Sequence, residues 1–298
     1  MHGSPCQDFS TMGKEKGGDE DSGTRSSLMF ETIRIVKKLK PKYVIWENVS
    51  NVLQTKHKHN FVKYLKYMEN LEYKNFYQVL NTKDYGIPQS RPRLFVVSIL
   101  GGKNYYFPQK KKLKVKLADL LENNVPEKYF LKDKTLEYFV RHEVEMRENK
   151  KGFRFGINNG QHNTNTITTK CGQRMDDTYI ADDTTIKNIR NRQHYLQYSQ
   201  KGYFEQHCRV YFDEIGTLKT RCNVQIHHLG KVRRLTPLEC FRLQGFSDEC
   251  YKKAKSVVSD YQLYKQIGNS ITVDVIYYIL HSLLVKPDIP ECEQLSIL

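Results

Sequence analysis

Two hydrophobic periods alternate along the first hundred residues. Between residues 28 and 39, apolar side chains recur at the spacing of one helix face, and Pro41 ends the predicted helix. Residues 43–46 form a continuous apolar run, as expected of a strand that is buried on both faces. A helix over 61–71 and strands over 76–80 and 94–100 are predicted in the same way.

Polar residues follow the first predicted strand directly. Glu47 and Asn48 come after the run 43–46. In open α/β sheets, ligands bind at the carboxyl ends of the strands. A carboxylate that ends a buried strand is costly unless it is hydrogen-bonded or functional, and burial raises its pKa. Glu47 is therefore a candidate functional residue.

The middle of the chain loses this regularity. From residue 101 to 230, Lys, Asn, Thr and Tyr increase and only short strand-like patches remain, which predicts a second, smaller module rich in strands and loops. Residues 166–171 (TITTKC) and 217–222 (TLKTRC) echo each other. Two related hairpins or chance explain this echo almost equally well.

Regular patterning returns after residue 230. Thr236, Pro237 and Glu239 have the spacing of a helix N-cap, a first-turn proline and a capping-box glutamate. An apolar helix is expected over 271–285. The division is therefore 1–100, 101–230 and 231–298, with the first and last segments forming one α/β domain.

Composition narrows the class of partner and site. Lys and Arg outnumber Asp and Glu by 48 to 33, a net charge of +15 that attracts nucleic acid but also suits a solvated basic surface. The seven cysteines include no Cys-x-x-Cys pair, so neither a disulfide framework nor any metal site is predicted. With no apolar run suited to a signal peptide or a membrane span, we expect a cytoplasmic protein.

Three positions stand out for chemistry. A lone cysteine is more often a small core residue than a nucleophile. Cys6, however, sits among small residues and a proline, before the Gly-rich segment 11–27, which favours an accessible thiol. Arg91 and Arg93 enter a predicted strand two residues apart, so their side chains share one face. Without further information they could be only phosphate contacts.

Taken together, five segments resemble the motifs of the DNA cytosine-C5 methyltransferases, in that family's order. The resemblance spans essentially the whole chain, with the variable module between the third and fourth segments. The segments are residues 3–10 (GSPCQDFS), 47–49 (ENV), 89–93 (QSRPR), 234–246 (RLTPLECFRLQGF) and 266–271 (QIGNSI).

The resemblance implies a mechanism and a fold. Cys6 would be the thiolate that adds to cytosine C6, Glu47 would contact N3 and the exocyclic amine, and Arg93 the cytosine carbonyl. Arg91 would organise the loop. The target cytosine would flip out of duplex DNA, with segment 11–27 as a lid, or merely as a surface loop. The implied fold is an incomplete doubly wound (Rossmann-like) methyltransferase sheet with a strand- and loop-rich target-recognition module.

The resemblance also implies S-adenosylmethionine as methyl donor. Its main binding turn in the family precedes the nucleophile motif, so we expect an N-terminally truncated chain that needs the missing segment or a complementing subunit. Further expected partners are double-stranded DNA and a cognate restriction endonuclease. The implied donor contacts are Pro5, Asn269 and Ser270, and the implied DNA contacts are Gln7, Ser10, Arg234, Gln244, Thr217 and Leu218.

Two other functions remain open at this point. A catalytically inactive, sequence-specific DNA-binding remnant would keep the module and the basic surface, although every catalytic position holds the expected residue type. An RNA-directed enzyme of the same family is also compatible with base flipping. In either case, an incomplete sheet would expose an apolar edge and a helix-packing surface, so we expect low solubility or marginal stability.

Overall fold

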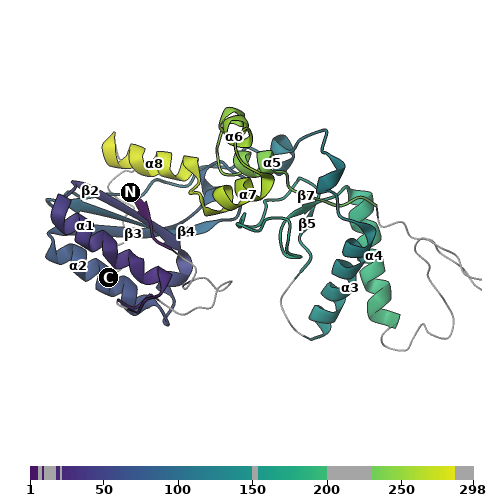
Figure 1. Ribbon diagram of the computed structural model, residues 1–298, viewed down its shortest axis with the longest axis horizontal. Coiled ribbons are helices and arrows are strands. Elements are labelled where there is room, and N and C mark those ends of the chain that lie inside the picture. Colours follow the sequence, from purple (N-terminus) through teal and green to yellow (C-terminus); the bar gives the residue numbers. More distant parts are fainter. Residues whose placement is uncertain (6–8, 10–17, 21, 150–153, 200–229, 286–298) are drawn as a thin grey trace, which may run out of the picture. The chain divides into compact units, whose positions relative to one another are not determined.

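The computed structural model describes residues 1–5, 9, 18–20, 22–149, 154–199 and 230–285, and within 154–199 it describes side chains up to residue 193. The chain divides into two compact units (Figure 1). Unit 1 comprises residues 1–113 and 271–298, and unit 2 comprises residues 114–270. These units are defined by contacts within the structure. The division predicted from the sequence, into 1–100, 101–230 and 231–298, stays a prediction about function.

Unit 1 is built on a four-stranded mixed sheet. Its strands are β1 (His2–Gly3), β2 (Tyr43–Val49), β3 (Tyr73–Asn81) and β4 (Pro92–Leu100), in the order β1-β2-β4-β3. β1 pairs in parallel with β2, whereas β4 runs antiparallel to both β2 and β3. The strands predicted from the apolar runs are therefore confirmed.

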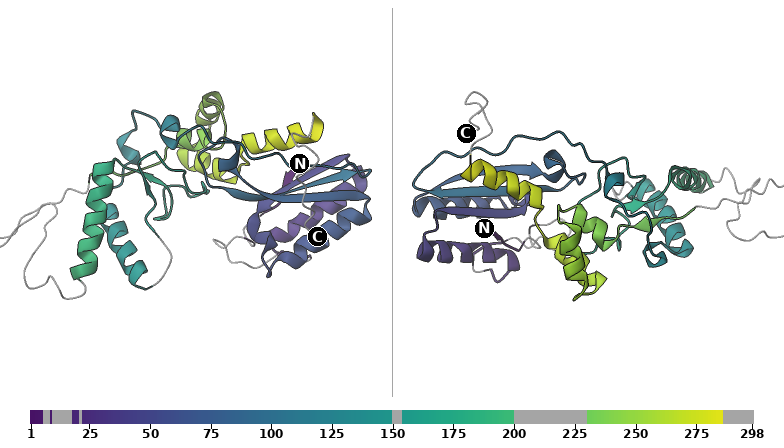
Figure 2. Two further views of the ribbon diagram at one scale, coloured as in Figure 1. Left: turned by 180° about the vertical axis from the view of Figure 1, so that it is seen from behind. Right: turned by 90° about the horizontal axis from the view of Figure 1, so that it is seen from above.

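Helices cover both faces of this sheet (Figure 2), as the α/β prediction requires. The 3₁₀ helix η1 (Arg25–Phe30), α1 (Glu31–Leu39) and α2 (Lys58–Asn70) lie on one face, and α8 (Val273–Leu284) on the other. Successive residues of β2 point to opposite faces. Trp46 therefore packs in the α1–α2 core, and Ile45 in the α8 core.

Short turns connect the strands of unit 1. The 3₁₀ helix η2 (Ser50–Leu53) follows β2. Between β3 and β4, η3 (Thr82–Tyr85) ends at Gly86, whose φ of 97° lies in the left-handed region that favours glycine. Gly86 thus lies in the turn between β3 and β4, before the two arginines.

Unit 2 combines a small sheet with helices. Strands β5 (Ile157–Asn158), β6 (Tyr179–Ile180) and β7 (Arg233–Arg234) form the sheet, in that order. The helical elements, in chain order, are η4 (Leu117–Leu120), η5 (Glu127–Tyr129), α3 (Asp133–Glu148), α4 (Asp183–Ser199), α5 (Pro237–Arg242), α6 (Asp248–Lys255) and α7 (Asp260–Asn269).

The helices α3 and α4 were not predicted from the sequence. Leu136 and Val140 of α3 are buried against the small sheet. Ile189 of α4 belongs to the same apolar cluster, and Gln193 adds a 2.5 Å hydrogen bond to the buried carboxylate of Glu143. Buried polar residues interrupt the apolar face of each helix, Glu143 in α3 and Arg192 and Gln193 in α4, which weakens the pattern in the sequence.

The predicted start of α5 is confirmed in atomic detail. The hydroxyl of Thr236 accepts from the backbone N–H of Glu239 at 3.2 Å, and the carboxylate of Glu239 accepts from the N–H of Thr236 at 2.8 Å. Arg233 adds two further hydrogen bonds of 2.8 Å to the same carboxylate. Much of segment 234–246 therefore has a structural role.

One stretch, Asp260–Leu284, meets the length and composition of a membrane-spanning helix, contrary to the expectation from the sequence. It is not one continuous helix, because the extended residues Ser270 and Thr272 separate α7 from α8. Ile267 is buried in unit 2 and Ile279 in unit 1. The core helix of a soluble protein can pass the same test, so one such stretch is weak evidence of a membrane span.

Candidate active site

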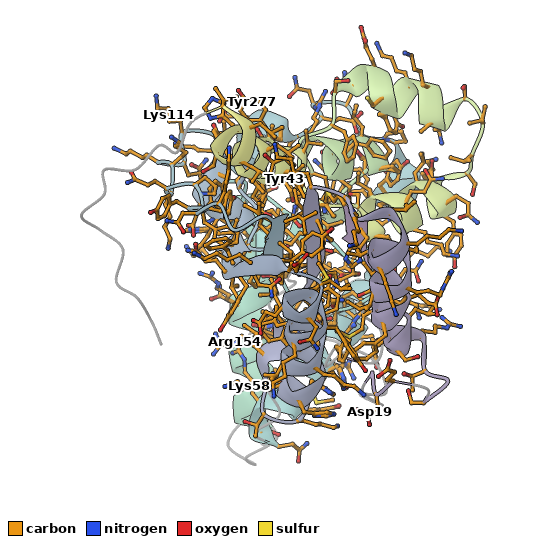
Figure 3. All side chains as sticks on the ribbon, turned by 90° about the vertical axis from the view of Figure 1, so that its left-hand side faces the viewer. Asp19, Tyr43, Lys58, Lys114, Arg154 and Tyr277 are labelled. Carbon is orange, nitrogen blue, oxygen red and sulfur yellow. The ribbon has the colours of Figure 1, made fainter. Side chains whose placement is uncertain are left out.

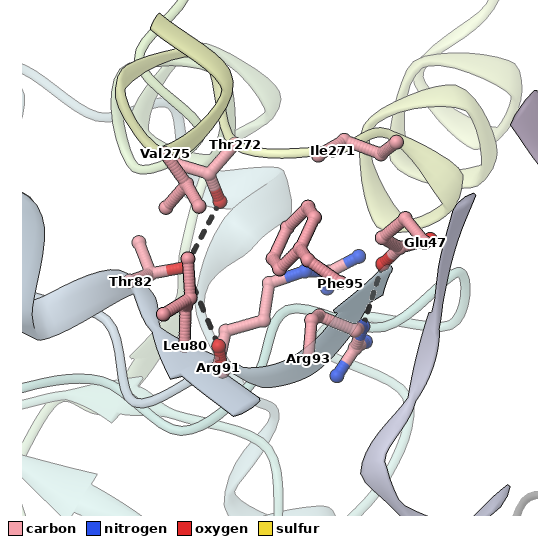
Figure 4. Close-up of a pocket in the computed structure, with 9 residues that line it drawn as sticks. All are labelled: Glu47, Leu80, Thr82, Arg91, Arg93, Phe95, Ile271, Thr272 and Val275. Carbon is pink, nitrogen blue, oxygen red and sulfur yellow. Dashed lines mark hydrogen bonds and ion pairs between the residues drawn. The ribbon is translucent and has the colours of Figure 1, made fainter. Parts of the chain in front are cut away.

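The candidate site begins with a buried ion pair in unit 1. Glu47 lies near the end of β2, and Arg93 near the start of the antiparallel strand β4. The Nε atom of Arg93 is 3.2 Å from the Oε1 atom of Glu47, with 17% and 13% of the two side chains exposed (Figure 4). The two candidates predicted from separate segments therefore meet.

The surroundings of Glu47 change its protonation. Burial raises the pKa of the Glu47 carboxyl, and the positive charges of Arg93 and Arg91 only partly oppose this effect. A carboxyl with a raised pKa, next to a fixed guanidinium, can hold a proton at a higher pH than an exposed glutamate does. This is the behaviour expected of a group that donates to or accepts from a ring nitrogen.

The ion pair borders a narrow pocket between the sheet and the start of α8 (Figure 4). Its walls combine the polar groups of the two sequence motifs with apolar side chains from β3, β4 and α8. The lining residues are Glu47, Leu80, Thr82, Arg91, Arg93, Phe95, Ile271, Thr272 and Val275.

Arg91 is the second predicted arginine, and its backbone is fixed at the pocket wall. Its N–H donates to the Asn81 side chain at 2.9 Å, and its carbonyl accepts from the N–H of Thr82 at 3.3 Å. The hydroxyl of Thr82 also bonds to that of Thr272 at 3.0 Å. Arg91 is only 3% exposed, and its organising role stays a prediction.

The strand β1 brings the N-terminal motif alongside Glu47. Gly3 is in register with Glu47, and a Cβ atom at Gly3 would lie 3.6 Å from the Glu47 carboxylate. The next residue, Ser4, accepts hydrogen bonds from the Trp46 indole at 2.9 Å and the Asn48 amide at 3.0 Å. The predicted residues Cys6, Gln7 and Ser10 lie outside the described part of the chain.

The predicted donor contacts belong to different units. Pro5 is in unit 1, and its carbonyl already accepts a 2.9 Å hydrogen bond from Ser26. Asn269 is exposed at the end of α7 in unit 2, and the hydroxyl of Ser270 donates to the Ile267 carbonyl at 2.7 Å. Pro5, Asn269 and Ser270 therefore stay predictions as donor contacts.

The predicted DNA contacts that the structure describes lie in unit 2. The Arg234 guanidinium stacks 5.4 Å from the ring centre of Tyr129 and 5.9 Å from that of Tyr264. Gln244 is fully buried, so its side chain could reach DNA only if its surroundings moved. Thr217 and Leu218 lie outside the described residues.

Sequence reasoning missed the residues that support these groups. Ser26 and Thr272 form hydrogen bonds with Pro5 and Thr82, partners that lie 21 and 190 positions away in the chain. Thr272 follows the last motif directly, and this position in the sequence was the signal that could have marked it as a supporting residue. Nothing in the sequence distinguishes Ser26 from its neighbour Ser27.

Comparison with known proteins identifies the family of this chain. The family model described as C-5 cytosine-specific DNA methylase matches residues 1–284. The type II methyltransferase M2.ScrFI of Lactococcus lactis subsp. cremoris is 36% identical over 275 residues, which cover 91% of this chain and 62% of that protein. The type II methyltransferase M.SsoII of Shigella sonnei is 30% identical over 292 residues, covering 96% and 63%. The chain thus spans about three fifths of the length of these relatives.

Solved structures show the same fold. The Entamoeba histolytica methyltransferase EhMeth superposes with a TM-score of 0.62 at 19% identity, over 95% of this chain and 75% of that one. The S. pombe methyltransferase Dnmt2 gives 0.61 at 19% identity, over 96% and 76%. Since the family model matches almost the whole chain, the protein belongs to the C-5 cytosine-specific DNA methylase family.

Proposed function

We propose that the protein methylates C5 of a flipped cytosine in double-stranded DNA, with S-adenosylmethionine as methyl donor and Cys6 as nucleophile. One observation carries this proposal most directly. The buried Glu47–Arg93 pair lies beside β1, the strand that leads within three residues to Cys6. Membership of the family and the names of its type II relatives support it further.

Each of these residues has a distinct chemical task. The Cys6 thiolate attacks C6 of cytosine, and the electron pair of the C5–C6 double bond moves into the ring and makes C5 nucleophilic. Glu47, with its raised pKa, holds the proton at N3 as charge builds on the ring. Arg93 donates to the cytosine carbonyl, and Arg91 fixes the loop from which Arg93 projects. S-adenosylmethionine, when bound, would supply an electrophilic methyl group to C5. Loss of the C5 proton to a base and expulsion of the Cys6 thiolate from C6 then restore the C5–C6 double bond.

The proposed donor contacts Pro5, Asn269 and Ser270 need further protein groups. We propose that an additional N-terminal segment or a complementing subunit supplies them and packs on unit 1. Exposed apolar side chains support this, because surfaces of this kind are usually covered. They are Leu28, Ile35 and Leu39 along η1 and α1, and Val273, Tyr277, Leu280 and Leu284 along α8.

DNA binding is proposed for the target-recognition module, residues 101–230, and for Gln7, Ser10, Arg234, Gln244, Thr217 and Leu218. The net charge of +15 favours association with the phosphate backbone. A cytoplasmic location and a cognate restriction endonuclease as partner are proposed from the bacterial type II relatives. We propose no membrane partner, and stable binding of the protein to phospholipid vesicles would contradict this.

The proposal is tested by transfer of a radiolabelled methyl group from S-adenosylmethionine to duplex DNA, with structured RNA as the competing substrate. We expect labelled 5-methylcytosine in DNA, and none with Cys6→Ser. The matched control is Cys250→Ser, because Cys250 is an exposed free cysteine in unit 2. The assay is run on this chain and on the chain extended by the preceding reading frame. Sequence-specific DNA binding without transfer in either form would instead identify a catalytically inactive remnant.

A further inference from the structure

The segment that leads to Cys6 is held by a buried side chain from a distant part of unit 1. Ser26 in η1 is completely buried, and its hydroxyl donates a 2.9 Å hydrogen bond to the carbonyl oxygen of Pro5. That carbonyl belongs to the peptide unit between Pro5 and Cys6. Since a peptide unit is planar, a bond to its oxygen restrains the whole unit, which ends at the backbone nitrogen of Cys6.

A second contact holds the preceding residue. The indole N–H of Trp46, a residue only 1% exposed, donates to the Ser4 hydroxyl at 2.9 Å. Trp46 precedes Glu47 on β2, so the two side chains point to opposite faces of the sheet. One strand therefore presents Glu47 to the pocket and, from its other face, anchors the segment that carries the nucleophile.

The start of β1 is anchored as well. The two ring nitrogens of His2 lie 3.2 Å from the Thr32 hydroxyl and 3.3 Å from the Tyr64 hydroxyl, and its ring stacks on Trp46. Burial lowers the pKa of His2 to about 4, so the ring is neutral near pH 7 and can both donate and accept. β1 is thus fixed against α1 and α2 before the chain reaches Ser4.

We infer that Ser26 and Trp46 are positioning residues for the Cys6 nucleophile. Their hydrogen bonds hold Pro5 and Ser4, and so aim the Cys6 thiolate at C6 of a cytosine that contacts Glu47 and Arg93. This inference rests on the proposed function. Attack requires the reacting atoms to be about 3–3.5 Å apart, and a misplacement of about 1 Å can reduce the rate by about 100-fold.

The step that depends on this positioning can be measured without a methyl donor. When the thiolate bonds to C6, the electron pair of the C5–C6 double bond becomes available at C5, which takes a proton from water. Loss of the original C5 proton to solvent and expulsion of the thiolate then restore cytosine. The net change is exchange of the C5 hydrogen with solvent, followed as tritium release from duplex DNA labelled at cytosine C5.

Ser26→Ala is the first variant. We expect tritium release about 30-fold slower at saturating DNA, with DNA affinity within about two-fold of the unmodified chain. Ser26→Thr keeps the hydroxyl and should recover most of the rate. The matched control is Ser282→Ala on α8. It removes another buried serine hydroxyl, which donates to the Tyr106 carbonyl at 2.6 Å. It should leave the exchange rate unchanged.

Trp46→Phe provides an independent test if Ser26→Ala fails to fold. It removes the indole N–H, keeps an aromatic ring in the core and should slow exchange about ten-fold. Because Trp46 acts through the Ser4 hydroxyl, the double variant Ser4→Ala/Trp46→Phe should be no slower than the slower single variant. A merely structural effect would instead lower the thermal midpoint without this non-additivity.

Two outcomes contradict the inference in distinguishable ways. If the unmodified chain exchanges tritium, and folded Ser26→Ala and Trp46→Phe variants exchange within about two-fold of it, neither residue positions the nucleophile. If this chain and the chain extended by the preceding reading frame both bind DNA but neither releases tritium, the proposed function fails, and the inference fails with it.

Discussion

The Nε atom of Arg93 lies 3.2 Å from the Oε1 atom of Glu47, although the two residues come from motifs more than forty positions apart. In the ladder between β2 and β4, Glu47 is opposite Phe95 and Val49 is opposite Arg93. Glu47 and Arg93 are therefore diagonal neighbours, close enough for long side chains to meet. The strand register thus assembles a proton-holding carboxyl and a fixed cation at one end of the sheet.

Glu47→Gln should greatly slow tritium release from cytosine C5. The amide cannot hold a proton at N3, and loss of one general acid or base typically costs about 100- to 10,000-fold in rate. DNA affinity should change little, because the substitution conserves shape. Exchange by Glu47→Gln within about three-fold of the unmodified rate would remove Glu47 from the mechanism.

The raised pKa of Glu47 also predicts a pH dependence of stability. A carboxyl whose pKa is higher in the folded than in the unfolded state favours folding at low pH, and this contribution is lost as pH rises through the folded pKa. The free energy of unfolding of the unmodified chain, relative to Glu47→Gln, should therefore fall from about pH 4 towards neutrality.

Urea unfolding followed by tryptophan fluorescence measures this difference in unit 1, because Trp46 is the single tryptophan of the chain. If the free energy of unfolding of the unmodified chain, relative to Glu47→Gln, rises with pH, the charges of Arg93 and Arg91 affect the pKa of Glu47 more than burial does. The pKa of Glu47 would then lie below its ordinary value.

The Arg233–Glu239 pair should be a major stabilising contact of unit 2. The Glu239 carboxylate is fully buried and accepts two 2.8 Å hydrogen bonds from Arg233. Glu239→Ala would leave a buried guanidinium uncompensated, so we expect a loss of about 3–5 kcal/mol in the free energy of unfolding. Far-ultraviolet circular dichroism during urea titration measures it.

The matched control for that experiment is Glu31→Ala on α1. Glu31 pairs with Arg34 at 2.8 Å, but the two side chains are 54% and 72% exposed. An exposed pair of this kind contributes about 0–1 kcal/mol. Equal losses for the buried and the exposed pair would contradict the assigned role of Glu239.

Gly268 in the last motif has a packing role that substitution should reveal. A Cβ atom there would lie 2.4 Å from backbone atoms of both Thr168 and Thr169, so a side chain would force the loop away from α7. Gly268→Ala should destabilise unit 2 by about 1–3 kcal/mol. Lys265→Ala, at an exposed position of the same helix, should change stability by less than about 0.5 kcal/mol. Equal stability of the two variants would show that the loop yields freely.

Local patterns in the sequence predicted much of this molecule. Residues 43–46 read as a buried strand because both faces of the sheet are covered, and the spacing of Thr236 and Glu239 revealed the capping box. In both cases the signal and the structure lie within a few residues of each other. Family motifs added chemical roles for the candidates Glu47, Arg91 and Arg93, which the structure brings into one pocket.

Contacts between distant residues were beyond the reach of such patterns. The Thr82–Thr272 and Ser26–Pro5 hydrogen bonds depend on how unit 1 folds, and no spacing rule connects residues so far apart. Buried polar residues such as Glu143 and Gln193 likewise concealed α3 and α4, because they interrupt the apolar stripe on which helix prediction relies.

The central claim is that Cys6 bonds covalently to cytosine C6, and mapping of the adduct tests it most directly. The protein is incubated with duplex DNA that carries 5-azacytosine, whose nitrogen at position 5 makes C6 more electrophilic, so that no methyl donor is required. Peptide mass spectrometry should find the nucleotide on Cys6, and Cys6→Ser should form no adduct. An adduct on another cysteine, or equal labelling of the Cys6→Ser variant, would contradict the account.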